Sequence, residues 1–153
     1  MSTITNDNEF KSILGKLTTV QQRIVGALFV ENVLNLCDDR RIKNAIAAAK
    51  NSATSLDELA AAHKSAKAAS VERFTPCGKD ADWLKQAGHF VAEASATCVT
   101  PDEQLMQMDN LAWNTAMHAR MAKTCETIAA GEGSENQERE QQYQILGNFM
   151  KNT

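Results

Sequence analysis

Aromatic residues are scarce in this sequence, at 5% of 153 residues, and the residues that favour strands never cluster. No stretch alternates apolar and polar residues over the length of a strand, so we expect no β-sheet. Alanine is abundant instead, in runs such as 47–49, 60–62 and 68–69. Because alanine is the strongest helix former and lets helix backbones approach closely, the sequence predicts an all-α fold.

Long apolar runs are also absent. The longest candidate, residues 20–37, is interrupted by polar side chains such as Gln21, Arg23 and Glu31, which make it too polar to span a bilayer. Residues 1–11 are polar and lack the apolar core of a signal peptide. These two absences lead us to expect a cytoplasmic protein, of bacterial type, that does not act at a membrane.

The chain has no strong excess of charge of either sign. Its net charge is −3 and its isoelectric point is about 5.6, which argues against a nucleic-acid partner because nucleic-acid-binding proteins usually carry a basic patch. The hydrophobic content of 43% and the charged content of 23% are ordinary for a globular protein. We therefore expect a single helical domain over 1–153, with a frayed end over 1–9 and a loop over 131–137.

Closely spaced cysteines are missing as well. The chain has four cysteines, Cys37, Cys77, Cys98 and Cys125, and no CxxC pair or histidine at zinc-binding spacing accompanies them. Cys37 and Cys98 lie on apolar helical stripes. The pattern favours buried thiols in a reducing compartment over disulfides or a metal site.

Apolar residues recur at helical spacing along most of the chain. The periodicity predicts a short helix or turn around 10–17, followed by helices over 19–37, 39–51, 55–74, 80–99 and 101–130, and a last helix after 137. The predicted helix over 19–37 is apolar around more than half of its circumference, which indicates a central, buried helix. Together these segments predict a bundle of five to seven mostly antiparallel helices.

Capping signals support most of these boundaries. Ser55 and Glu58 have the spacing of a capping box, and Thr18 or Thr19 can cap the helix that follows them. The sequence Thr-Pro-Asp-Glu at 100–103 resembles a helix start, and 134–137 resemble a weaker capping box. Gly131 and Gly133 are expected to end the long helix before that loop.

Motifs for catalysis are absent. There is no GxSxG elbow, no cysteine in a glycine-framed loop and no phosphate-binding glycine loop. The Glu-x-x-His pattern of four-helix di-iron sites is missing too. We therefore expect no catalytic residues, no metal ion and no cofactor.

The three histidines are better explained by structure than by chemistry. His89 and Glu93 are four residues apart and share one side of a helix with other polar residues, which favours a solvated surface. His63 and His118 lie on apolar stripes, which favours hydrogen-bonded core histidines. A metal-dependent helical enzyme that uses His89, Glu93, His63 or His118 stays open as an alternative.

Two kinds of segment are candidates for contact with a partner. The charged run 38–41 is expected to be solvated, as is the run 138–140, but the first can also serve as a polar hinge that grips a partner. The predicted helix over 101–130 carries a second apolar stripe with Trp113, Met106, Met117 and Met121. Such a stripe is more often core than an adaptable binding surface, although it permits a homodimer.

Several stretches together resemble one protein family. Residues 29–36 contain a glutamate followed by Val-Leu, 60–69 form an alanine-rich helix with His63, and 87–94 begin Ala-Gly-His. Residues 39–46 resemble a segment Asp-x-Arg-Pro-Arg-x-Ala-Ile, in which Lys43 keeps the charge and Ile42 replaces the proline. Residues 138–146 resemble a closing Glu-Arg-x-x-Trp-Gln segment, with Tyr143 in place of the tryptophan.

In their order along the chain, the five segments resemble the Imm-5-like bacterial immunity proteins, which accompany polymorphic toxins. The resemblance covers residues 19–151 by pattern. It departs from the family at Glu93 and Ser95, where a Thr-Ala-His run is more usual. The resemblance implies a helical protein that neutralises a cognate toxin by binding it, without catalysis and without a cofactor.

The sequence therefore predicts an immunity-type inhibitor with a protein partner. The residues expected to contact that partner are Asp39, Arg41, Lys43, His89, Glu93, Trp113 and Met117. Two alternatives remain: a phage or mobile-element inhibitor of a host defence complex, and the metal-dependent helical enzyme described above.

Overall fold

A computed structural model describes residues 3–74, 82–105 and 110–152, and this part of the chain is helical with no strand in it. The predicted all-α helical bundle is thereby confirmed. The α-helices are α1 (Asp7–Lys16), α2 (Thr19–Glu31), α3 (Arg40–Lys50), α4 (Leu56–Arg73), α5 (Trp83–Cys98), α6 (Leu111–Ala129) and α7 (Glu138–Lys151). Two short 3-10 turns are η1 (Leu34–Leu36) and η2 (Asp102–Gln104).

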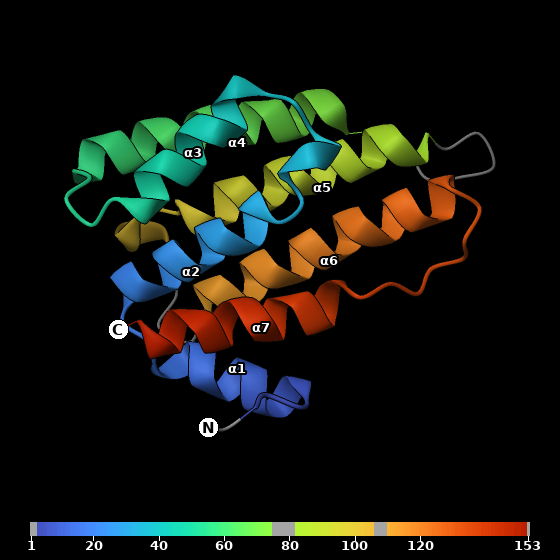
Figure 1. The fold of residues 1–153 in the computed structure, drawn as a ribbon. Coiled ribbons are helices and arrows are strands. Elements are labelled where there is room, and N and C mark those ends of the chain that lie inside the picture. Colours follow the sequence, from blue (N-terminus) through green and yellow to red (C-terminus); the bar gives the residue numbers. More distant parts are fainter. Residues whose placement is uncertain (1–2, 75–81, 106–109, 153) are drawn as a thin grey trace.

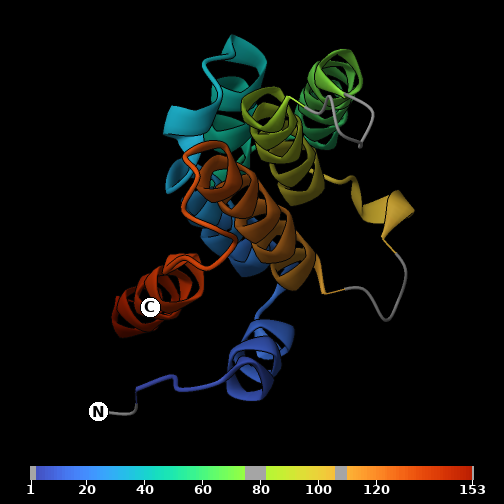
Figure 2. The same cartoon turned by 90° about the vertical axis from the view of Figure 1, so that its right-hand side faces the viewer.

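The helices lie in layers (Figure 1). α3 and α4 form one side of the molecule, α1 and α7 form the opposite side, and α2, α5 and α6 lie between them. The most extensive packing joins α5 to α6 and α4 to α5, whereas α1 and α7 make fewer contacts with the central helices. Figure 2 shows α1 and α7 set apart below the rest of the bundle.

The predicted helix starts are confirmed at the best capping signals. Ser55 and Glu58 form a capping box at the start of α4, and Thr18 forms another with Gln21 at the start of α2. At the start of α3, the Asp39 side chain accepts a hydrogen bond from the backbone N–H of Arg41. In each case a side-chain oxygen satisfies a backbone donor that the helix itself leaves without a partner.

The predicted helix over 19–37 is too long. α2 ends at Glu31, where Asn32 closes the helix, and the chain then turns through η1. Val33 and Cys37 are nevertheless buried, at 1% and 4% exposed. The residues of the turn therefore bury apolar side chains in the core just as a longer helix would. An apolar pattern alone cannot distinguish such a turn from a continuing helix.

The predicted helix over 101–130 is also wrong at its start. Thr100-Pro101-Asp102-Glu103 leads only into η2, and Leu105 is extended. α6 begins at Leu111, where the Asn110 side chain accepts a hydrogen bond from the N–H of Trp113. Met106 of the predicted stripe lies outside the described residues. α6 ends as expected before Gly131, whose positive φ of 77° suits a residue without a side chain.

The two terminal helices differ from expectation at their starts. α1 begins at Asp7, inside the stretch that we expected to be frayed, and Asn6 caps it. α7 begins at Glu138 without a side-chain cap from Gln137, so the predicted capping box over 134–137 is wrong. Asn136 accepts the hydrogen bond from the N–H of Glu138 instead.

Two hydrophobic clusters fill the interior. The larger core lies among α2, α3, α4, α5 and α6 and consists mainly of alanine and β-branched residues. The second core lies where α1 and α7 pack against α2 and α6, and Phe10 and Phe29 dominate it.

Cys37, Cys98 and Cys125 are buried, and burial raises the pKa of the Cys98 thiol to about 12. Cys77 lies outside the described residues.

Within the described ranges, no helix combines the length and the apolar character needed to cross a bilayer.

Candidate functional site

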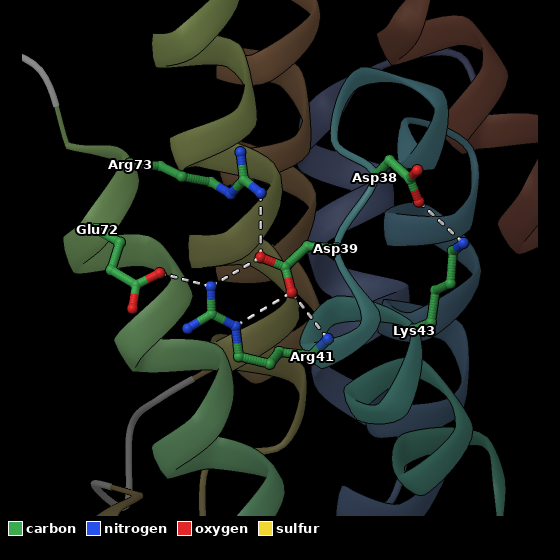
Figure 3. A network of polar contacts seen from close by, with 6 residues as sticks. All are labelled: Asp38, Asp39, Arg41, Lys43, Glu72 and Arg73. Carbon is green, nitrogen blue, oxygen red and sulfur yellow. Dashed lines mark hydrogen bonds and ion pairs between the residues drawn. The ribbon is translucent and has the colours of Figure 1, made fainter.

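Asp39 is the centre of a charged network that joins the start of α3 to the end of α4 (Figure 3). Its carboxylate caps α3 and also accepts hydrogen bonds from Arg41 Nε at 3.1 Å and Arg41 Nη2 at 2.9 Å. Arg73 Nη2, from the last turn of α4, donates a further bond at 3.1 Å. The Asp39 side chain is only 8% exposed. Hydrogen bonds from Arg41, and more weakly from Arg73, hold the pKa of this carboxyl far below its usual range.

Arg41 extends the network to the surface of α4. Its Nη2 lies 2.6 Å from Glu72 Oε2, and Figure 3 shows the two side chains pointing toward each other. The pKa of Glu72 is lowered by this guanidinium. Lys43 is not part of the network, because it pairs with Asp38 at 3.1 Å on the other side of the α3 start. Both partners of that pair are well exposed, so the Lys43 pair adds little to stability.

Arg73 also borders α5. A Cβ added at Gly88 would lie 3.7 Å from Arg73 Cδ and 3.6 Å from Cys37 Sγ, at ordinary van der Waals distance, so both side chains lie beside this glycine. The next residue, Phe74, packs edge-on against the His89 ring with their centroids 5.5 Å apart. The structure therefore links Asp39 to His89 indirectly, through Arg73 and Phe74 at the end of α4.

His89 and Glu93 form a polar seam between α5 and α4. His89 Nδ1 lies 2.8 Å from the backbone oxygen of Ser70, and the Ser70 hydroxyl donates to Glu93. Because a carbonyl oxygen only accepts hydrogen bonds, Nδ1 of His89 carries the proton. It cannot then accept the Ser70 proton, so Ser70 and His89 are not arranged as a nucleophile and its base.

The other two histidines extend the seam. His63 Nδ1 lies 2.9 Å from the backbone oxygen of Ala96, which ties α4 to α5 a second time. His118 of α6 is partly buried beside Glu93; burial lowers its pKa, although the Glu93 charge opposes that shift. In the part of the chain that the structure describes, no three His, Cys, Asp or Glu side chains gather closely enough to hold a metal ion.

Trp113 and Met117 lie elsewhere, in the second core. The Trp113 ring is 6.0 Å from that of Phe10, and the Arg120 guanidinium lies 5.8 Å above it. Met117 packs against the same cluster. α1 and α7 therefore cover much of the second apolar stripe of α6, although Met121 remains 44% exposed.

Large exposed apolar side chains gather beside the charged network. Val71 is 71% exposed and Phe74 is 59% exposed, at the end of α4. Together with Arg41, Glu72 and Arg73 they form a surface that we call the α4-end surface. Glu72, Arg73 and Phe74 could not be predicted as site residues, because nothing in the local sequence pattern distinguishes them from ordinary residues at a helix end. The proline and glycine that follow at 76 and 78 were the only signal that α4 ends there.

The protein is a small helical bundle, and its α4-end surface carries a network of ion pairs beside exposed apolar side chains. Comparison with known proteins finds no family model, no curated protein and no solved structure that matches the chain.

Proposed function

We propose that the protein is a non-catalytic binder that holds a protein partner against the α4-end surface, and that this partner is a cognate bacterial toxin. The observation that carries the proposal is the exposure of Val71 and Phe74 directly beside guanidinium groups fixed by the buried carboxylate of Asp39. The toxin as partner rests on the resemblance of the sequence to the Imm-5-like immunity proteins.

The α4-end surface has the chemistry of an interface centre. Aromatic and arginine side chains dominate the binding energy of protein interfaces. Arg41 and Arg73 are already held in place by Asp39, so they lose little side-chain freedom when a partner binds. Two carboxylates, of Asp39 and Glu72, balance the two guanidiniums, which favours a protein partner over a polyanion.

The test begins with affinity capture of the tagged protein from its source cells, with the captured protein identified by mass spectrometry. The captured protein is then expressed alone and together with this chain in a bacterial host, and growth is measured. We expect growth arrest in the first case and rescue in the second. Phe74→Ala should weaken binding by about 2 kcal/mol, or roughly 30-fold, and abolish the rescue.

Met150→Ala is the matched control. Met150 is 43% exposed on α7, a helix that packs on the side of the bundle away from α4 (Figure 1). This variant should bind and rescue like the unaltered chain. A captured protein that does not arrest growth contradicts the toxin, and capture of a multi-subunit defence complex favours the alternative inhibitor. Equal losses in both variants contradict the assignment of the surface.

A further inference from the structure

A cavity lies at the opposite end of α4 from the α4-end surface. It has a volume of about 170 Å³ and opens between the first turn of α2, the end of α3 and the first turn of α4. One wall is apolar and consists of Val20, Ala48, Ala49, Leu56 and Leu59. An engineered protein cavity of about 150 Å³ takes a benzene molecule, so this one accommodates an apolar group of that size.

Arg23 lines the cavity as a nearly buried cation. The residue is 6% exposed. Its Nη2 donates to the backbone oxygen of Thr100 at 2.7 Å and to Asp102 Oδ1 at 2.6 Å. Its Nε is buried and has no hydrogen-bond partner. Buried donors without an acceptor are rare in folded proteins, so the guanidinium has binding capacity that the chain itself does not use.

The counter-ion of Arg23 lies at the surface. Asp102 belongs to the short turn η2, and its side chain is 60% exposed, compared with 7% for Arg23. A carboxylate from outside can therefore share or replace this contact while Asp102 returns to water. Arginine is well suited to the exchange, because its planar group binds a carboxylate through two parallel N–H donors.

The mouth of the cavity is partly apolar. Val20 is 44% exposed and Leu56 is 61% exposed, and both line the cavity together with the exposed polar residues Asn51 and Ser52. A ligand larger than the cavity would therefore contact apolar side chains as it leaves the pocket. The cavity thus combines a cationic donor inside with an apolar wall and a rim that is partly apolar.

We propose that this cavity binds a carboxylate carried on an apolar group about the size of a benzene ring, with the carboxylate on Arg23. The ligand is either a free aromatic acid or the C-terminal carboxylate of a peptide chain that ends in an aromatic residue. The proposal does not depend on the toxin-binding function, because the residues involved lie at the other end of α4.

The first experiment is a titration of the isotope-labelled protein with sodium benzoate, followed by amide NMR shifts. We expect saturable shifts of residues around the cavity, and at least tenfold weaker binding of benzyl alcohol, which has the same ring without the charge. Asp102→Asn should tighten benzoate binding several-fold, because a competing carboxylate is removed. Thermal unfolding of the variant checks that the fold persists.

A matched pair of alanine variants tests the location. Ala48 lines the cavity and Ala47, its neighbour on α3, is exposed. Ala48→Leu should fill the cavity and abolish benzoate binding, whereas Ala47→Leu should leave it unchanged. The proposal is overturned by the absence of benzoate shifts around the cavity, by weaker binding in Asp102→Asn, or by equal effects of the two leucine variants.

A second arm distinguishes the two sources of the carboxylate. A short peptide ending in phenylalanine is titrated with a free C-terminus and with an amidated one. Binding of the free acid at least tenfold tighter than benzoate, lost on amidation and weakened by Leu56→Ala, identifies a chain terminus as the ligand. Equal or weaker binding of the peptide identifies a free aromatic acid.

Discussion

The two cores of this bundle use opposite kinds of side chain. In the larger core, α4, α5 and α6 meet mainly through alanines such as Ala66, Ala92 and Ala119, all fully buried. In the second core, Phe10 contacts Phe29, Trp113 and Tyr143, with ring centroids 5.2 to 6.0 Å apart. α2 and α6 contribute to both cores, so the same two helices pack in two different ways on their two sides.

The difference reflects the space between helix backbones that the side chains of each core must fill. Alanine leaves room for helix backbones to approach closely, and the larger core contains the most extensive helix packing in the molecule. α1 and α7 make fewer contacts and are held by a few large side chains. A few aromatic residues therefore stabilise the terminal helices, whereas many small ones stabilise the centre.

The largest expected effect comes from Phe10→Ala. Phe10 is 0% exposed and touches three other rings. Its loss leaves a void that the sparse contacts of α1 cannot close, so the free energy of unfolding should fall by about 3–5 kcal/mol. Urea unfolding followed by circular dichroism measures this. Phe74→Ala, at a mostly exposed phenylalanine that packs against the His89 ring, is the control and should cost no more than about 1 kcal/mol.

Ala119→Leu tests the larger core by adding side-chain volume instead of removing it. Ala119 is fully buried between closely packed helices, so three additional carbon atoms force the helices apart and should cost about 1–3 kcal/mol. Ala129→Leu, at the exposed end of the same helix, should be nearly neutral. If the two variants unfold at the same urea concentration, the close packing of the alanine core is contradicted.

Asp7→Asn should weaken the second core by a smaller amount. Asp7 accepts bonds from Arg120 at 2.9 and 3.0 Å and from the Tyr143 hydroxyl at 2.7 Å. Because its side chain is 38% exposed, solvent screening limits the loss to about 1 kcal/mol. The bond with Arg120 lowers the pKa of Asp7, so its contribution is present above the ordinary aspartate pKa, near 4, and is lost as the pH falls.

The measurement for Asp7 is the free energy of unfolding between pH 3 and pH 7. The unaltered chain should lose part of its stability toward pH 3, and Asp7→Asn should lose less. A variant whose stability falls as steeply as that of the unaltered chain contradicts the role of this carboxylate.

Glu138→Gln has the smallest expected effect and the opposite dependence on pH. Glu138 is 2% exposed, and its carboxylate accepts two bonds from Asn32 Nδ2 at 2.9 and 3.1 Å. Burial raises its pKa above that of an unfolded glutamate. The contribution of Glu138 is therefore complete at low pH and is lost as the pH rises through the raised pKa.

Glutamine keeps an acceptor for Asn32 and removes the buried charge. Glu138→Gln should therefore be at least as stable as the unaltered chain at pH 8, and the difference should shrink toward pH 4. Unfolding at both pH values tests this, and a variant that is clearly less stable at pH 8 contradicts it.

Local signals predicted much of the fold. The Ser55–Glu58 capping box, the Thr18 cap and the helical periodicity place α2, α3 and α4 at their observed starts. The start signal at Thr100-Pro101 failed because its Asp102 is drawn to Arg23, 79 residues earlier in the chain. A capping preference of order 1 kcal/mol is easily overridden by such a tertiary contact.

The candidate site was less predictable. The sequence favoured solvated surface for the charged runs 38–41 and 138–140, but Asp39 and Glu138 are buried. Their partners, Arg73 and Asn32, lie far away in the sequence, and charge runs do not reveal which member turns inward. The indirect link from Asp39 to His89, through Arg73 and Phe74, likewise follows from the packing of α4 on α5, which periodicity cannot supply.

The aromatic contacts of Phe10 also set an order of events during synthesis. The α1 helix is made well before Trp113 and Tyr143, against which Phe10 packs. At ~5–20 residues per second, Phe10 waits on the order of ten seconds for Tyr143. The buried residues of the larger core run only as far as Ala122, so the second core, which includes Leu146, is the later of the two to have all its residues made.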